Sequence, residues 1–436
     1  MNKFEKLLLT VFFVELFVGG GGRLIDFGIL SLRQVLFIGL MFTFFYRIIS
    51  HKAFRNLEVN TFIRWNPVTI GIYLLIGWFG ISAIIGYLNG NALSDIVTDF
   101  LRVSFFAAYF PLAYYLSEKR FTKQRVMTLL KYSAFAVALF TVLIALLGKT
   151  VFSGNFQPYK LFLLSLMGDD LLFRPSYSVF YKSHFYVFVG LVLSLNAVRV
   201  KKFTWVDIAN LILCPVSIFW SETRGFLFAL MVSVLMIMII DIIVMAAPIK
   251  TFSGKIKAIF QNTQLVKKSL ILLVITVSVP FLYQYMTLER FEKSSAAAGS
   301  EQINDTSASV RVEYVLYSKD LLLDNPEYFV WGKGYGTEIA GRVTGIETSF
   351  LDILVEQGGI GLVIWLILCL FVYTNYYTSF RKGIALETAD ISLLGIFMGV
   401  LLLTNINPFI NNPIGIIFFL AVLIFSLQAR EKVVQS

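Results

Sequence analysis

An all-α membrane protein that crosses the bilayer about twelve times is the fold class that this sequence predicts. Two observations concern composition: hydrophobic residues make up 57% of the 436 residues, and charged residues only 15%. Soluble domains carry roughly 25% charged residues. The third observation is the recurrence of apolar stretches of 18 or more residues. Each is long enough to cross, as a helix, a bilayer core of about 30 Å.

A single membrane domain covering residues 1–436 is expected. Its predicted spans run roughly over 7–20, 28–48, 68–88, 100–117, 126–147, 177–198, 205–220, 225–246, 269–287, 350–378, 390–404 and 412–428. The first is expected to remain as a span, because no small-residue cleavage site follows it and Gly19–Gly22 is typical of a turn.

The lysines and arginines between the spans predict the orientation of the chain. With the N-terminus in the cytoplasm, every inner segment contains at least two basic residues, whereas the short outer loops 88–99 and 404–413 contain none. Both termini are therefore expected in the cytoplasm. The net charge of +10 agrees with this orientation and with attraction to anionic lipid headgroups. It indicates membrane lipids, and no nucleic acid, as partners.

Neither a metal ion, nor another cofactor, nor a disulfide framework is expected. Cys214 and Cys369 both lie within apolar segments, which does not favour a disulfide or a thiolate site. His51 and His184 have no ligand-like neighbours at metal-binding spacing.

The longest outer loop, residues 288–349, is expected to contain an amphipathic helix at 309–324. Its apolar and tyrosine side chains recur at helical spacing, at Val310, Tyr314, Val315, Tyr317, Leu321 and Leu322. Ser309 is a suitable N-cap, and Asn325 before Pro326 is a stop signal. The following segment WGKGYGTE, residues 331–338, predicts a tight loop with exposed backbone amides.

Several basic residues do not follow the orientation rule. Arg33, Arg102 and Lys182 lie within or at the edges of predicted spans. A charge inside the membrane costs about 2.5–3.5 kcal/mol on insertion scales and usually faces a polar cavity. Extension of the long side chain to the interface is the alternative explanation.

Two further arginines stand near the starts of expected helices on the outer side. Arg224 belongs to SETRG, residues 221–225, and follows Thr223 as a suitable N-cap, while Arg311 stands two residues after Ser309. A cation in a first helical turn opposes the helix dipole, which favours an anion there. A bound phosphate would suit both the dipole and the guanidinium. The alternative is that Arg224 pairs with Glu222, and Arg311 with a nearby carboxylate.

Glu347 is the outer carboxylate with the most informative position. It stands directly before the apolar segment 350–378, at the expected membrane boundary. A partly desolvated carboxylate there can accept a proton from a hydroxyl group. The alternative is a glutamate that interacts favourably with the dipole of a first helical turn.

Taken in order, these segments resemble the O-antigen polymerase and O-antigen ligase superfamily of bacterial envelope glycosyltransferases. The resemblance covers mainly residues 215–380 and the twelve-span layout. It is carried by SETRG (221–225) at the end of a span, SVRVEYVLYSKDLLLDNP (309–326), WGKGYG (331–336), and ETSFLDILVEQGGIGL (347–362) leading into the next span.

The resemblance implies a membrane glycosyltransferase (GT-C-like) bundle with a cavity at its outer face. It implies a glycan donor linked through pyrophosphate to undecaprenol, and metal-independent transfer on the periplasmic face of the inner membrane. Arg224 and Arg311 match the family's arginines in these segments and would bind the pyrophosphate. Glu347 is expected, from its position at the membrane boundary, to act as catalytic base. Secondary phosphate or sugar contacts are expected from Arg174, Arg290, Arg342, Glu222 and Tyr314.

The resemblance favours a polymerase that joins lipid-linked repeat units, with a flippase and a chain-length regulator as expected partners. Ligases carry a histidine where this chain has Glu347, which argues against transfer to a lipid A-core. An O-antigen ligase remains one alternative, and a flippase or secondary transporter another, although no half-to-half repeat of the kind common in transporters is found. The sugar composition, the linkage and the type of polysaccharide stay open.

Overall fold

The computed structural model describes residues 1–22, 30–174, 176–200, 203–247, 277–285, 306–343 and 345–435, together with 251, 254, 270, 273 and 274. These residues are mostly helical. The helices are α1 (Lys3–Val18), α2 (Leu32–Ser50), α3 (Pro67–Leu88), α4 (Leu93–Ser104), α5 (Tyr109–Tyr115), α6 (Lys123–Lys149), α7 (Phe156–Met167), α8 (His184–Arg199), α9 (Trp205–Trp220), α10 (Gly225–Ala246), α13 (Thr306–Asp324), α14 (Pro326–Trp331), α15 (Ser349–Arg381), α16 (Thr388–Leu403) and α17 (Pro413–Gln435).

The helices are those of a polytopic membrane protein. Within the described residues, seven helical segments are long and apolar enough to cross a bilayer. They lie in α2, α3, α4 with α5, α6, α10, α15 and α17. Three shorter apolar helices, α8, α9 and α16, accompany them. The all-α membrane class is therefore confirmed, whereas the total of twelve spans stays a prediction.

Two short antiparallel strands, β1 (Leu171–Phe173) and β2 (Val179–Tyr181), form a hairpin before α8. The prediction of a helix from residue 177 is wrong at this end, because α8 begins at His184. The hairpin is tied to α1 by the Tyr181 hydroxyl, which donates to the Val18 carbonyl at 2.7 Å. Aromatic and β-branched residues suit paired strands, and the pairing with β1 keeps this segment out of the helix.

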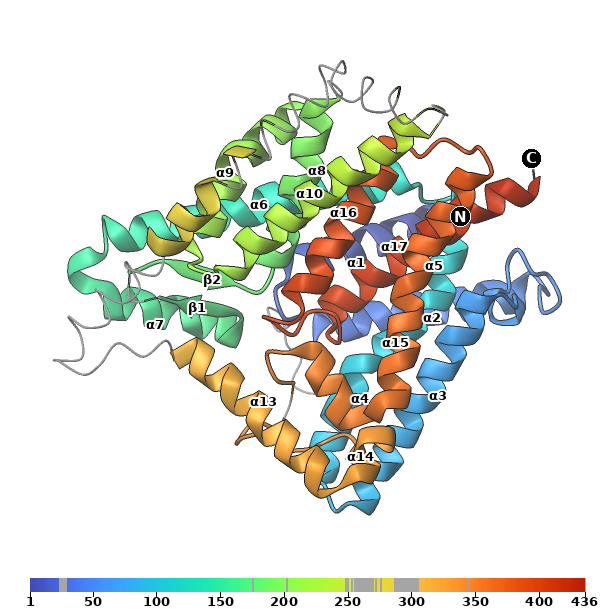
Figure 1. Cartoon of the computed structure of the whole chain (residues 1–436), viewed down its shortest axis with the longest axis horizontal. Coiled ribbons are helices and arrows are strands. Elements are labelled where there is room, and N and C mark those ends of the chain that lie inside the picture. Colours follow the sequence, from blue (N-terminus) through green and yellow to red (C-terminus); the bar gives the residue numbers. More distant parts are fainter. Residues whose placement is uncertain are drawn as a thin grey trace.

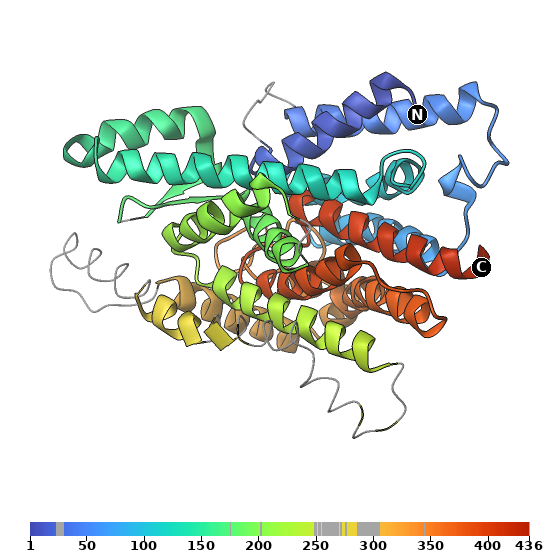
Figure 2. The same ribbon diagram turned by 90° about the horizontal axis from the view of Figure 1, so that it is seen from above.

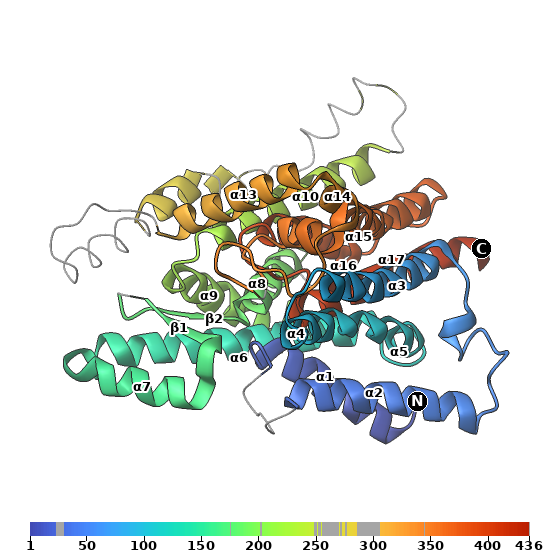
Figure 3. The same cartoon turned by 90° about the horizontal axis from the view of Figure 1, so that it is seen from below.

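Both chain termini lie at the end of the molecule opposite α7. Figure 1, Figure 2 and Figure 3 all show this arrangement. The helix α13 runs along one edge of the molecule toward α14 (Figure 1). The orientation of the two termini relative to the membrane stays a prediction.

The charged residues at the edges of predicted spans have carboxylate partners. Arg33 Nε lies 2.9 Å from Glu15 Oε2, and Lys182 Nζ lies 2.7 Å from Asp170 Oδ1. Asp170 is 2% exposed. Since a buried charge is tolerated when it is paired and hydrogen-bonded, these residues have a structural explanation.

The WGKGYG segment is not a loop with exposed amides, so that prediction is wrong. Three successive backbone N–H groups donate to carbonyls of other elements. The N–H groups of Lys333 and Gly334 donate to the carbonyls of Val355 and Glu356 in α15, at 2.8 and 3.1 Å. The N–H of Tyr335 donates to the Ser82 carbonyl in α3 at 3.1 Å. The N–H of Gly336 donates to the Asp99 carboxylate at 3.0 Å. The segment therefore joins α3, α4 and α15.

Replacement of Gly334 by alanine is expected to destabilise this junction by about 3–5 kcal/mol, from backbone strain and overpacking together. Gly334 has φ +91°, and an added methyl group would come within 2.1 Å of the Gly86 nitrogen. Gly341, with φ +79° and open space around it, provides the matched control Gly341→Ala. Thermal unfolding of the two purified variants in detergent measures the difference. Equal unfolding temperatures would contradict the close approach at Gly334.

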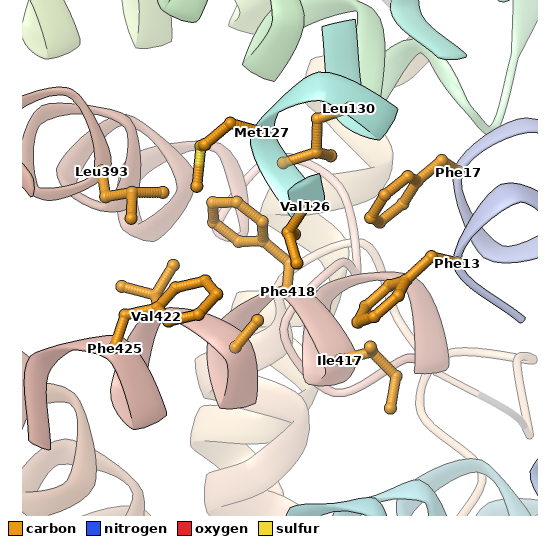
Figure 4. Close-up of a pocket in the computed structure, with 11 residues that line it drawn as sticks. Phe13, Phe17, Val126, Met127, Leu130, Leu393, Ile417, Phe418, Val422 and Phe425 are labelled. Carbon is orange, nitrogen blue, oxygen red and sulfur yellow. The ribbon is translucent and has the colours of Figure 1, made fainter. Parts of the chain in front are cut away.

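A small apolar pocket lies inside the bundle between α1, α6, α16 and α17 (Figure 4). Its volume is about 10 Å³, and its lining includes Phe13, Phe17, Met127 and Phe418. One water-sized probe occupies about 10–15 Å³. This pocket is therefore a packing gap in the core and no substrate site.

Candidate active site

The candidate base and one candidate phosphate-binding arginine form an ion pair. Nη2 of Arg311, on α13, lies 2.7 Å from Oε2 of Glu347, which stands two residues before α15. The side chains are 27% and 31% exposed, respectively. The carboxylate expected from the sequence as a neutralising partner of Arg311 is thus Glu347 itself. A cation and a proton acceptor stand side by side at a partly exposed position.

The position of Arg311 on its helix differs from the prediction. The helix α13 begins at Thr306, so Arg311 lies in its second turn rather than in the first turn after Ser309. The influence of a helix dipole is concentrated in the first turn. The dipole argument therefore does not hold for Arg311, whose anion-binding capacity rests on the guanidinium alone.

Arg224 stands at the N-cap position of α10. Its Nη1 donates to the Tyr283 hydroxyl at 3.3 Å, and its guanidinium carbon lies 5.0 Å from the centre of the Tyr283 ring. A tyrosine ring attracts a guanidinium and limits its directions. Arg224 stands at the dipole-positive end of a helix, where an anion is favoured.

The residue Ile406 lies between Arg311 and Gly225, the residue that follows Arg224. Its carbonyl accepts a hydrogen bond from Arg311 Nη2 at 3.2 Å. A methyl group added at Gly225, the first residue of α10, would come within 3.1 Å of the Ile406 side chain. Phe226, the next residue of α10, and Phe409, three residues after Ile406, have ring centres 6.4 Å apart. The start of α10 and the Arg311–Glu347 pair therefore flank the same short loop.

Glu222 and Arg174 belong to the turn that precedes Arg224. Glu222 has φ +51° and is 3% exposed, and its carboxylate accepts a hydrogen bond from the Ser176 hydroxyl. Arg174 Nε donates to the Ser221 carbonyl at 3.3 Å. A positive φ is uncommon for a residue with a side chain and usually marks a functional or strained turn. These contacts fix the backbone that leads to Arg224.

Two other secondary candidates, Tyr314 and Arg342, have different surroundings. Tyr314 is 6% exposed and packs in a small apolar cluster with Ile339, Ile346 and Val355. Arg342 is exposed, and its backbone pairs with that of Ile339. Arg290 lies outside the described residues.

The loop of residues 404–412 belongs to the same region but was not among the sequence candidates. Its sequence TNINPFINN contains four asparagines between two apolar segments, a signal that could have identified it, because amides are costly beside a membrane unless they have partners. Among the described residues, four buried polar atoms in this region have no hydrogen-bond partner: the acceptor Glu347 Oε2 and three groups that can donate, Asn407 Nδ2, Thr348 Oγ1 and Arg311 Nε. Such a group of unsatisfied donors suits a polar ligand.

Taken together, the region offers two guanidinium groups for an anion, one carboxylate for a proton, and further polar groups for hydroxyls. A phosphorylated and hydroxylated ligand matches this set.

No family model matches the chain. An O-antigen polymerase of Shigella flexneri is 28% identical to it over 444 aligned positions, which cover 99% of this chain and 97% of the relative. The similarity thus extends over nearly the whole length of both proteins.

Proposed function

We propose that this chain is a member of the O-antigen polymerase family and a glycosyltransferase that lengthens a polysaccharide on a lipid carrier, because it is similar to an O-antigen polymerase over nearly its whole length. The donor is a glycan linked to undecaprenyl pyrophosphate. The acceptor is a second lipid-linked repeat unit. Transfer takes place on the outer face of the cytoplasmic membrane, and both termini of the protein lie in the cytoplasm.

In this proposal Arg224 and Arg311 bind the donor pyrophosphate. The acceptor hydroxyl oxygen forms a bond to the anomeric carbon of the donor, and the bond from that carbon to the phosphate oxygen breaks. The hydroxyl proton passes to Glu347, and undecaprenyl pyrophosphate leaves. The guanidinium groups stabilise the negative charge that develops on the leaving phosphate, which is where fixed charges contribute most to catalysis.

The observation that supports this mechanism best is the ion pair between Arg311 and Glu347 beside the loop that also contacts the start of α10. A base must stand within about 2.6–3.2 Å of the proton that it removes, or be separated from it by one water. A carboxylate held against a phosphate-binding arginine lies close to the bond that breaks. The unpaired donors of Thr348 and Asn407 would then bind sugar hydroxyls.

The test is polymerisation by the purified protein in vesicles that contain lipid-linked repeat units and no ion or voltage gradient. Lipid-linked products of two or more repeats are expected, with release of undecaprenyl pyrophosphate. A ligase would give no such products until a separate acceptor is added. A flippase or transporter would move the substrate across the vesicle membrane and leave it as single repeats. Either result would contradict the proposal.

A further inference from the structure

The backbone segment that carries Glu347 is held on both sides by buried polar contacts. Before it, the Ile346 N–H donates to Asp352 Oδ1 at 3.3 Å. After it, the Ser349 N–H donates to the Thr404 carbonyl at 3.0 Å. Glu347 itself is 31% exposed, so the direction of its carboxylate depends on these two fixed points and on Arg311.

Asp352 connects this segment to the loop 404–412. Its Oδ2 accepts a hydrogen bond from Asn411 Nδ2 at 2.6 Å, and the other end of that amide, Oδ1, accepts from the Ser349 hydroxyl at 2.9 Å. Asp352 and Asn411 are each 1% exposed. Because an amide that donates and accepts cannot be rotated without loss of both bonds, the network allows one arrangement of the two segments.

Arg102 holds Asp352 in place. Its Nη2 lies 3.2, 3.3 and 3.1 Å from carboxylate oxygens of Asp99, Asp352 and Glu356, respectively. Gly345 lies directly on the same guanidinium, since a methyl group added there would come within 2.2 Å of Arg102 Nη1. The guanidinium thus pairs with all three carboxylates.

Tyr335 is a buried neighbour of this cluster. The Tyr335 side chain is 0% exposed. Burial, and then the charge of Glu356, raises the pKa of its hydroxyl well above the ordinary value. The ion pairs of Arg102 thus connect α4 with α15, and Asp352 connects α15 with Ile346 and with the loop 404–412.

We infer that Asp352 is a positioning residue for the transfer reaction, which acts through Ile346 and Asn411 to fix where the Glu347 carboxylate meets the acceptor hydroxyl. The inference rests on the proposed function of Glu347. Buried charged networks contribute less to stability than well-packed apolar residues of the same size, and one use of such networks is to specify a single geometry. Here the network around Asp352 would specify the position of the Glu347 carboxylate.

The variant Asp352→Asn keeps the size of the side chain and the acceptor for Ile346 but removes the charge and the acceptor for Asn411. A displacement of about 1 Å at a reacting group can reduce the rate ~100-fold. The kcat of the folded, purified variant is expected to fall by about that factor, with KM for the lipid-linked donor unchanged. A purely structural role would instead lower the yield or the unfolding temperature and leave kcat per folded molecule at the wild-type value, which would overturn the inference.

Asp390→Asn is the matched control. Asp390 is also buried, with 4% of its surface exposed. It pairs with Lys123 at 2.7 Å and accepts a hydrogen bond from the Tyr376 hydroxyl at 3.0 Å. It lies at the start of α16, whereas the loop 404–412 follows the other end of that helix. Its kcat per folded molecule is expected to match the wild type. A loss of kcat equal to that of Asp352→Asn would show a general effect of removing a buried charge, and would overturn the inference.

The double variant Asp352→Asn with Asn411→Asp exchanges the carboxylate and the amide across their hydrogen bond. It is expected to recover at least one tenth of the wild-type kcat, because the donor–acceptor pair is restored with reversed direction. No recovery would contradict the network. If Asp352→Asn does not fold, Asn411→Ser replaces it, since this variant shortens the same connection and leaves every charge in place, with the same ~100-fold loss of kcat expected.

The variant Glu347→Gln separates this inference from the proposed function. Full activity of Glu347→Gln would show that Glu347 is not the base, and would contradict both the proposed role of Glu347 and the positioning role of Asp352. If Glu347→Gln is inactive and Asp352→Asn is fully active, Glu347 remains the candidate base, and only the positioning role of Asp352 is overturned.

Discussion

Replacement of Arg224 by alanine is expected to abolish chain lengthening, with a loss of at least ~10³-fold in kcat, while the protein still folds and inserts. Loss of one fixed donor to a developing negative charge costs ~10²–10³-fold in well-studied enzymes, and Arg224 adds a full charge at the start of α10. In vivo, single repeats on the final acceptor would replace the polymer. In vitro, lipid-linked repeat units would accumulate unused.

The size of the effect distinguishes a phosphate contact from a structural one. Arg224→Lys keeps the charge but loses the planar, two-pronged contact and the stacking on Tyr283, so partial activity is expected. Arg120→Ala is the matched control, because Arg120 also stacks on a tyrosine, Tyr114, at 4.0 Å, and pairs with Glu58. It lies between α5 and α6, in a segment expected on the cytoplasmic side. Normal polymer from Arg224→Ala, or equal losses in both alanine variants, would refute the role of Arg224.

The helical framework could be predicted from the sequence because its signal is local. Long apolar stretches with few charges form helices in a membrane, since every backbone polar group must be satisfied within the segment. The hairpin of β1 and β2 could not be predicted in this way. Its short strands are stabilised by pairing and by the contact of Tyr181 with Val18, and these contacts join residues far apart in the sequence.

The candidate site was predicted in part, for the same physical reason. Arg224, Arg311 and Glu347 were proposed from their positions at helix starts and membrane boundaries, but no spacing rule indicated that Arg311 and Glu347 pair across 36 residues. The glycines of WGKGYG indicated a tight turn, yet their amides have partners in α3, α4 and α15. Asn411 and Asp352 interact only because α15 and the loop 404–412 meet in the fold.

Replacement of Glu347 by glutamine is expected to reduce kcat by ~10²–10⁴-fold, the usual contribution of a general base. The amide keeps the size of the side chain and can still accept a hydrogen bond from Arg311, so binding of the donor should change little. Single-turnover transfer with purified protein and lipid-linked repeat units measures the chemical step directly. A kcat within a few-fold of the wild type would contradict the assignment of Glu347 as base.

The variant Glu347→His separates proton transfer from charge pairing. A neutral imidazole can take a proton but cannot neutralise Arg311, whereas the glutamine amide can do neither. If Glu347 is the base, Glu347→His should recover measurable transfer that increases with pH through the imidazole range, around a pKa of roughly 6.5. If Glu347 only neutralises Arg311, the histidine variant should be as inactive as the glutamine variant at every pH. If neither residue of the pair acts on the substrate, the double variant Arg311→Gln with Glu347→Gln should regain activity, because neither charge is left unpaired; no recovery is expected if Arg311 binds the pyrophosphate.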